Sequence, residues 1–113
     1  MLFSLFDTKA CNFGSLIALE NADVARRNFV MSMLSPEKSP VRDFPDDYIL
    51  YEMGGFDNHT GEITVHACPI KVMTGFEAVE QAKKYILKKQ REELENGIRS
   101  EESSDTTCVE SNN

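Results

Sequence analysis

The sequence predicts a small α+β domain: a short antiparallel sheet with a central hairpin, one packed helix, a longer C-terminal helix and a disordered acidic tail. Three observations predict it. Two alternating apolar runs flank a loop rich in Gly, Asp and Asn, which is typical of a hairpin. Apolar residues recur at three- and four-residue intervals over 22–34 and 74–96, which indicates two amphipathic helices. The C-terminal residues after 96 are mostly polar and acidic.

The length and composition allow one core. A chain of 113 residues falls within the usual size of a single domain, roughly 100–200 residues. The hydrophobic fraction of 41% suffices for a globular interior. We therefore expect one domain over residues 1–96, including the basic C-terminal helix. Residues 97–113 cannot bury enough apolar surface to offset chain entropy and are expected to form the disordered tail.

The N-terminal residues 2–6 form a short aromatic-rich run closed by Asp7, which favours a first strand over a helix. The next apolar segment, 13–19, is ambiguous. Its glycine and serine favour a loop, while its last four residues fit either a second short strand or an extended lead into the next helix.

The first helix is predicted over 22–34. Asn21 precedes it as N-cap, because its side-chain oxygen can accept a hydrogen bond from an otherwise unpaired amide of the first turn. The core-facing stripe consists of Ala22, Ala25, Phe29 and Met33. Ser35-Pro36 ends the helix, and the proline-rich residues 36–47 predict an irregular connection.

The hairpin is predicted from residues 48–53 and 62–68, which alternate as strands do. In the second run we expect the apolar side chains to point inward, namely Ile63, Val65 and Ala67. Pro69 is expected to weaken or end this strand because proline cannot donate to the ladder. Residues 70–73 fit a resumed extended segment.

The second helix begins after Thr74, which has Glu77 three residues later in the arrangement of a capping box. Four residues are predicted to face the core: Phe76, Val79, Ala82 and Ile86. Gly97 is expected to end the helix.

The acids around the hairpin loop raise the question of general acid/base catalysis. Glu52, Asp57 and Glu62 are close in sequence, but acids beside a turn are usually solvated and keep ordinary properties. Gly54-Gly55 is not a phosphate loop, because no Lys-Ser/Thr pair and no helix N-terminus follow it. We expect the two glycines to allow a bend or bulge.

Residues 57–62 resemble a calcium loop only in composition. That loop needs oxygen ligands at its first, third and fifth positions and glycine at the sixth, whereas His59 holds the third and Gly61 the fifth. Turn chemistry explains the segment better. Asp57 and Asn58 are expected to bond nearby backbone amides, and Gly61 to adopt a positive φ before the second strand.

The cysteines and histidines give no catalytic or metal motif. Cys11, Cys68 and Cys108 are odd in number, widely spaced and without a CxxC pair, so neither a disulfide framework nor a zinc site is expected. Reduced thiols fit a reducing compartment, and Cys68 is predicted to be packed. His59 and His66 accompany no nucleophile motif. We therefore expect no enzyme, no metal and no cofactor.

We expect a soluble intracellular protein without a membrane partner. No stretch approaches the roughly 20 apolar residues that span a bilayer. The apolar N-terminus is too short for a signal-peptide core and no positive charge precedes it.

The net charge of −7 hides a strong asymmetry. Residues 71–91 hold six Lys/Arg against two Asp/Glu, whereas the segments before and after them are acidic. On a helix, Lys84, Lys88 and Arg91 share one side, which predicts a cationic surface that can follow phosphates. The full set of predicted nucleic-acid contacts is Lys83, Lys84, Lys88, Lys89 and Arg91, with Arg26 and Arg27 of the first helix.

The alternative interpretation of these lysines is an ordinary solvated helix face. In that case Lys88 pairs with Glu92 and Lys89 with Glu93, each at the i,i+4 spacing that favours such ion pairs. The sequence leaves both interpretations open.

Three spaced blocks resemble the small non-structural protein of gokushoviruses, which are single-stranded DNA microviruses of bacteria. The likeness covers roughly residues 5–75, and the third block is the specific one. The blocks are Phe6-Asp7-x-Lys9-Ala10-x-x-Phe13, Ala25-Arg26-x-x-Phe29 and Pro45-x-Asp47-Tyr48-x-Leu50-Tyr51-x-x-Gly54-x-Phe56-Asp57-x-x-x-Gly61.

The resemblance implies a non-enzymatic viral accessory protein of the host cytoplasm that acts in single-stranded DNA replication or packaging by binding DNA. The family has no established catalytic residues, so none is transferred. The alternative is a protein-interaction adaptor that binds a replication, scaffolding or host protein without direct DNA contact. The Lys-rich helix and acidic tail exceed the shorter ends typical of the family.

Overall fold

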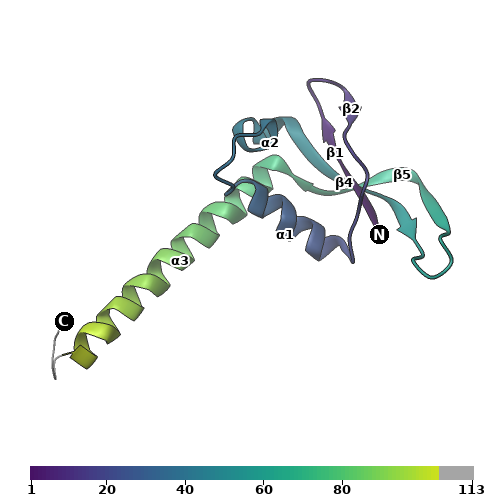
Figure 1. Ribbon diagram of the computed structural model, residues 1–113. Helices are drawn as coiled ribbons and strands as arrows, with labels where there is room; N and C mark the ends of the chain where they lie inside the picture. The colour runs from purple at the N-terminus through teal and green to yellow at the C-terminus, as the bar shows by residue number, and fades with distance from the viewer. Residues whose placement is uncertain (105–113) are drawn as a thin grey trace. The chain divides into compact units, whose positions relative to one another are not determined.

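The structure is a computed structural model that describes the backbone of residues 1–104 and the side chains of residues 1–96. The described residues fall into two units, the first made of residues 1–82 and the second of the part of α3 that begins at Lys83. The mixed α+β class predicted from the sequence is confirmed (Figure 1). The elements are β1 (Leu2–Asp7), β2 (Asn12–Phe13), β3 (Ile17–Ala18), α1 (Ala22–Ser32), α2 (Pro40–Asp43), the 3-10 helix η1 (Pro45–Asp47), β4 (Tyr48–Phe56), β5 (Ile63–Thr74) and α3 (Gly75–Ser104).

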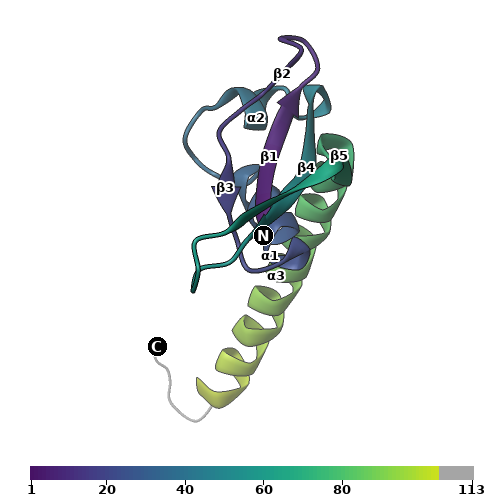
Figure 2. The same ribbon diagram turned by 90° about the vertical axis from the view of Figure 1, so that its right-hand side faces the viewer.

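The first unit is an antiparallel sheet in the order β2-β1-β4-β5, and β3 also pairs with β1. The segment that the sequence left ambiguous therefore forms two very short strands along one edge of β1. The predicted hairpin of β4 and β5 is confirmed. In Figure 2 the strands lie in front and α1 lies behind them, so α1 covers one face of the sheet.

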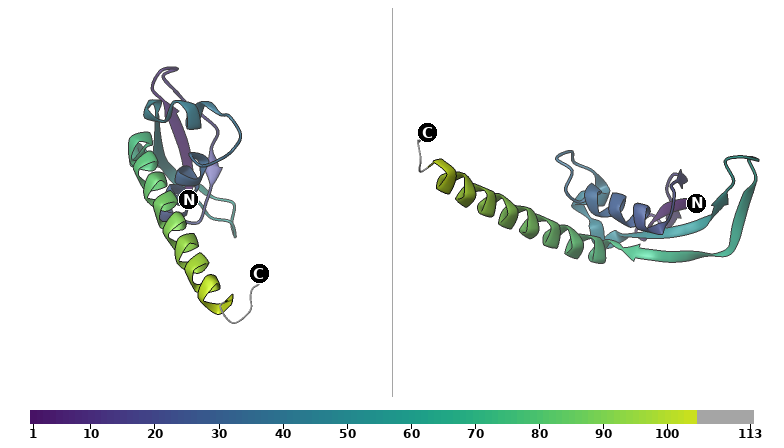
Figure 3. Two further views of the ribbon diagram at one scale, coloured as in Figure 1. Left: turned by 90° about the vertical axis from the view of Figure 1, so that its left-hand side faces the viewer. Right: turned by 90° about the horizontal axis from the view of Figure 1, so that it is seen from below.

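The β4–β5 ladder contains a large irregularity. Its register passes from Glu52↔Ile70 to Gly54↔Val65, so one residue of β4 faces four residues of β5, 66–69. Pro69 lies in this irregularity, where its missing N–H costs no ladder hydrogen bond. It therefore does not end the strand, which runs unbroken to Thr74. Figure 3 shows the distal part of the hairpin bending away from the direction of its base.

The core lies between the sheet, α1 and the first turns of α3. Its buried residues are Phe3, Ala25, Phe29, Leu50, Met73 and Ala78. Ala22 and Met33 pack against this cluster, so the predicted core stripe of α1 is confirmed.

The core-facing side of α3 differs from the prediction. Ala78 and Ala82 are buried, whereas Phe76 is 62% exposed and Ile86 is also exposed. The helix begins at Gly75, directly against the backbone of Pro45 and Tyr48. Because there is little space at this point, small residues occupy the buried side of the helix. Of the four predicted residues, Ala82 is confirmed as buried and Val79 is half-buried, whereas the predictions for Phe76 and Ile86 are wrong.

The inward positions predicted for β5 are also wrong. Ile63, Val65 and Ala67 are all exposed, with Val65 at 78%. Among the described residues of this strand, Met73 near the other end is the one that is buried, at 8% exposure. Alternation gives the two faces of a strand, but whether another element covers a face depends on residues far away in the sequence.

The two predicted N-caps are confirmed, and α1 ends at Ser32, two residues before the predicted end at 34. The Asn21 side chain accepts a hydrogen bond from the Val24 amide at 2.9 Å. Thr74 and Glu77 form the predicted capping box. The Thr74 amide donates a hydrogen bond to the Glu77 carboxylate, and the Glu77 amide donates one to the Thr74 hydroxyl. The connection at 36–47 is more ordered than expected, since it holds α2 and η1.

The predicted end of the second helix is wrong, because α3 does not end at Gly97 but continues to Ser104. A single glycine inside a helix costs about 1 kcal/mol relative to alanine, which a long run of strong helix formers tolerates. The predicted disordered tail therefore begins too early, since residues 97–104 are helical. Its remainder, 105–113, lies outside the described residues.

Candidate nucleic-acid interface

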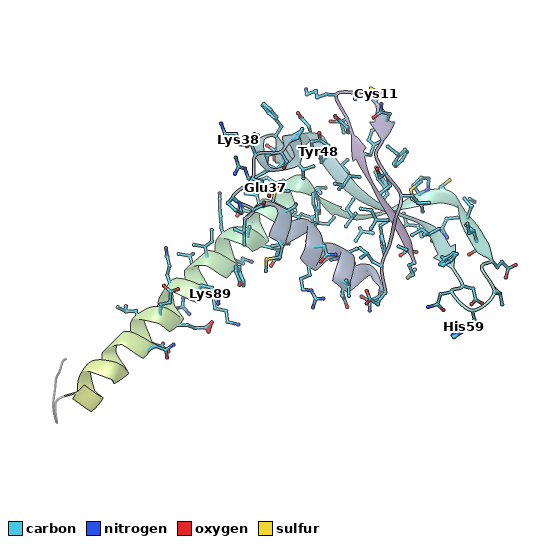
Figure 4. The ribbon with its side chains drawn as sticks, viewed as in Figure 1. Cys11, Glu37, Lys38, Tyr48, His59 and Lys89 are labelled. Atoms are coloured by element: carbon cyan, nitrogen blue, oxygen red, sulfur yellow. The ribbon has the colours of Figure 1, made fainter. Side chains whose placement is uncertain are left out.

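The second unit contains the cationic part of α3. Five predicted contact residues lie on this helix within nine consecutive positions, and all five side chains are exposed. They are Lys83, Lys84, Lys88, Lys89 and Arg91. Figure 4 labels Lys89, whose side chain extends outward from α3. We call these five residues the cationic surface.

The pairs that would neutralise this surface are not formed. Among the side chains that the structure describes, Lys88 makes no ion pair with Glu92, and Lys89 makes none with Glu93. The spacing of Lys84, Lys88 and Arg91 on one side of a helix is as predicted. Within residues 1–96 no ion pair occupies these ammonium and guanidinium groups, so with respect to those residues they can contact an external anion.

The two arginines predicted to join the cationic surface belong to the first unit. Arg26 makes an ion pair with Asp23 one helical turn earlier, at 2.7 Å. Arg27 is exposed on α1. Arg26 and Arg27 thus lie on α1 of the first unit, whereas the other five predicted contacts lie on the part of α3 in the second unit.

The loop between β4 and β5 is a turn. The Asp57 carboxylate accepts hydrogen bonds from the amides of His59 at 2.9 Å and Thr60 at 3.4 Å. Gly61 has φ +78° and its amide donates to the Asp57 carbonyl at 2.7 Å, which confirms the predicted positive φ. His59 lies at the tip of the hairpin in Figure 4. Within the described residues no group of three His, Cys, Asp or Glu side chains could hold a metal ion.

Three carboxylates of the first unit have lowered pKa values because backbone amides stabilise their charged forms. The amide of Ala10 is the main cause for Asp7, that of His59 for Asp57, and that of Thr74 for Glu77. The folded state thus takes up protons less readily than the unfolded state. The resulting stability is fully present above the unfolded pKa values and is lost as pH falls through the lowered ones.

We therefore expect the free energy of unfolding to be nearly constant from about pH 7 to 5 and to fall below about pH 4, where unfolded Asp and Glu titrate. Urea titrations across this range measure it. A variant carrying Asp7→Asn, Asp57→Asn and Glu77→Gln should lose part of the acid dependence. An unchanged dependence in that variant would contradict the assignment.

Glu52 and His66 form a pair that the sequence did not predict. The Glu52 Oε2 and His66 Nε2 atoms are 2.6 Å apart, and the Glu52 side chain is 13% exposed. His66 lies in the irregular part of β5, which brings it to Glu52 of β4. The partner of Glu52 is thus a histidine of the neighbouring strand. Cys68, predicted to be packed, is exposed because the irregularity turns this segment outward.

An aromatic cluster is the feature that sequence reasoning missed. Phe6, Phe13 and Tyr51 come from β1, β2 and β4. The ring centroid of Phe6 lies 4.8 Å from that of Phe13 and 6.4 Å from that of Tyr51, and the Phe13 and Tyr51 centroids are 5.7 Å apart. A shallow hollow of about 380 Å³ is lined by these rings and Pro69. The available signal was the resemblance itself, since its blocks contain all three aromatic residues.

The comparisons with known proteins identify a family. No curated protein and no solved structure matches the chain significantly. Within the described residues no helix combines the length and apolar character needed to cross a membrane. The family model described as Phage ORF5 protein matches residues 1–78. Since this match spans more than half of the 113 residues, the chain belongs to the Phage ORF5 protein family.

Proposed function

We propose that this phage protein is a non-enzymatic accessory protein that binds single-stranded DNA in the host cytoplasm during genome replication or packaging. The observation that carries the proposal is the cationic surface, five exposed cations within nine residues of one helix. The resemblance to gokushovirus non-structural proteins is the reason for proposing single-stranded DNA as the ligand and genome replication or packaging as the process. The family match ends at residue 78, so the cationic surface lies beyond it and stands on its own geometry.

The charge of the whole chain does not oppose this proposal. Phosphate contacts depend on cations within about one Debye length, roughly 8 Å at physiological salt, and distant acids are screened. The local charge on this part of α3 is therefore the quantity that matters: residues 83–95 hold five Lys/Arg against three Glu, an excess of two positive charges despite the net charge of −7. Binding by such a surface releases counterions and is steeply salt-dependent.

Titration of a labelled single-stranded oligonucleotide at several salt concentrations tests the proposal. For single strands each neutralised phosphate contributes a slope of about −0.7 to the plot of log K against log salt concentration. If Lys84, Lys88 and Arg91 each neutralise one phosphate, their joint replacement by alanine should weaken binding and make the slope shallower by about 2.

The matched control replaces three acids of the same helix, Glu92, Glu93 and Glu95, by alanine. This variant alters the same number of exposed charges and retains the cationic surface, so it should bind as tightly as the wild type or more tightly. Absence of salt-dependent binding by the wild-type protein would refute direct DNA contact.

A protein-interaction adaptor is the second candidate function, and exposed apolar side chains of α3 favour it. Tyr85, Ile86, Leu87 and Leu94 are all exposed, with Leu87 at 61%. Such residues next to cations suit a helix that docks on an acidic and apolar partner surface. A pull-down from infected cells distinguishes the two functions: a viral replication or scaffolding protein retained after nuclease treatment supports the adaptor, and its loss supports DNA binding.

A further inference from the structure

The side chains of Phe6, Phe13 and Tyr51 form an aromatic surface on the face of the sheet opposite α1. We propose that this aromatic surface stacks unpaired DNA bases and so gives the protein a preference for single strands over duplex. The inference rests on the proposed function, because it assigns a second contact to the same ligand. It concerns bases, whereas the cationic surface concerns phosphates.

The strand register places the three rings together. Phe6 of β1 lies directly opposite Phe13 of β2. Tyr51 of β4 pairs with Ser4, two residues from Phe6 on the same side of β1. The Phe13 and Tyr51 rings meet edge to face, with an interplanar angle of 70°. Each ring thus holds its neighbours in place from a different strand, and the surface is preorganised.

The aromatic surface is not part of the core. The neighbouring residues Leu5 and Leu50 pack toward α1 as part of the core or against it, and strand side chains alternate between faces. Phe13 remains 41% exposed, and the hollow beside the rings opens to solvent. Phe6 and Tyr51 are half-buried, so the cluster is partly exposed, and with its lining proline it has the chemistry that a flat, apolar ring can contact.

The charges around the aromatic surface suit a polyanion although the chain is acidic. Lys71 lies opposite Tyr51 on β5, and Lys9 lies in the turn that joins β1 to β2. The neighbouring acids Asp7 and Glu52 lie on the other face of the sheet, because strand side chains alternate between faces. There the Asp7 carboxylate accepts hydrogen bonds from two backbone amides, and the Glu52 carboxylate is hydrogen-bonded to the His66 ring.

One further acid approaches from α3. Glu77 lies close enough to Lys71 to be influenced by its charge. Its carboxylate is held by the amide and hydroxyl of Thr74. The strand residues paired with Phe6 and Tyr51 on β1, β4 and β5 are Ser4, Ile49 and Lys71, and none of them is an acid.

The chemistry of stacking selects the ligand. Every base has a π-face, so an aromatic surface accepts single strands with little sequence preference. In a duplex these faces are stacked on neighbouring base pairs and cannot reach a side chain. The aromatic surface therefore contributes affinity for single strands and none for duplex, whereas a cationic surface attracts both.

The test compares variants that remove a ring with variants that keep it. Phe13→Leu and Tyr51→Leu retain apolar bulk and lose the ring, while Phe13→Tyr and Tyr51→Phe keep it. Binding to labelled oligodeoxythymidine longer than about 16 nucleotides, and to a duplex of equal length, is measured by fluorescence anisotropy. Each leucine variant should bind the single strand about 5- to 150-fold more weakly, with an unchanged salt slope. Ring-retaining variants and all duplex affinities should stay close to wild type.

Failure of the inference and failure of the proposed function give different results. If wild type binds single strands and the leucine variants bind equally well, the inference is overturned and the cationic surface stands alone. If wild type does not bind, the proposed function itself fails.

Photo-crosslinking to an oligonucleotide carrying 5-iododeoxyuridine adds a measurement on the unaltered protein. Attachment within the peptides that contain Phe6, Phe13 or Tyr51 supports stacking, and attachment elsewhere alone contradicts it.

Discussion

Replacing Phe3 with alanine is expected to lower the free energy of unfolding by about 3–5 kcal/mol. Phe3 is fully buried and belongs to the cluster that joins β1 to α1, β4 and the start of α3. Truncation removes the buried ring and leaves a cavity among Phe29 and Leu50, which backbone elements on both sides keep open. Since small domains have only about 5–15 kcal/mol in total, this variant should be close to unfolding, as urea denaturation will show.

Phe76→Ala is the matched control, because it makes the same chemical change on an exposed side chain. The sequence predicted Phe76 to face the core, but its side chain is 62% exposed. Its replacement should change the free energy of unfolding by about 0.5 kcal/mol or less, as surface substitutions usually do. Equal losses for the two variants would refute the assignment of the core.

The parts of the fold that the sequence predicted well are those encoded by neighbouring residues. Asn21 caps α1, and Thr74 with Glu77 caps α3, because a cap needs partners only two or three positions away. The turn of Asp57 and Gly61 formed as expected for the same reason.

The errors occur where burial depends on elements distant in sequence. Ile63 and Val65 alternate as core residues do, yet no other element of the described structure buries them. Pro69 was expected to interrupt β5, but the mismatch with β4 provides a position where an N–H is not needed. Neither outcome follows from β5 alone, because each depends on the partner strand and on which part of the sheet the helices cover.

The two candidate contact surfaces differ in the same way, since one depends on residues close in sequence and the other on distant strands. The cationic surface was predictable because helix periodicity places Lys84, Lys88 and Arg91 on one side without any tertiary contact. The aromatic surface was not, because Phe13 belongs to a two-residue strand and meets Tyr51 through the order of three strands. A single sequence contains those residues but not the pairing that brings them together.

Replacing Gly75 with alanine is expected to destabilise the first unit by about 1–3 kcal/mol or more, although alanine is the better helix former. A Cβ atom at Gly75 would lie 1.6 Å from the Pro45 carbonyl oxygen, 2.5 Å from its carbon and 3.1 Å from the Tyr48 carbonyl oxygen. These are backbone atoms of η1 and the start of β4, so no side chain can rotate to relieve the overlap. Urea denaturation measures the loss.

Whether Gly75→Ala lowers or raises the free energy of unfolding shows which of two factors dominates at this position, close packing against backbone or helix propensity. In the described structure Gly61 is the glycine with a positive φ, so Gly75 is required for space and not for backbone conformation. Propensity alone predicts that Gly75→Ala stabilises α3 by about 1 kcal/mol. Gly14→Ala is the control, since its Cβ would meet the Leu5 carbonyl oxygen at an ordinary 3.6 Å, and it should change stability by less than about 1 kcal/mol. If Gly75→Ala is as stable as the wild type, the first turn of α3 does not lie against η1 as closely as the structure places it. Its loss of stability would explain why the buried side of this helix begins with glycine and continues with Ala78 and Ala82, while Phe76 faces solvent.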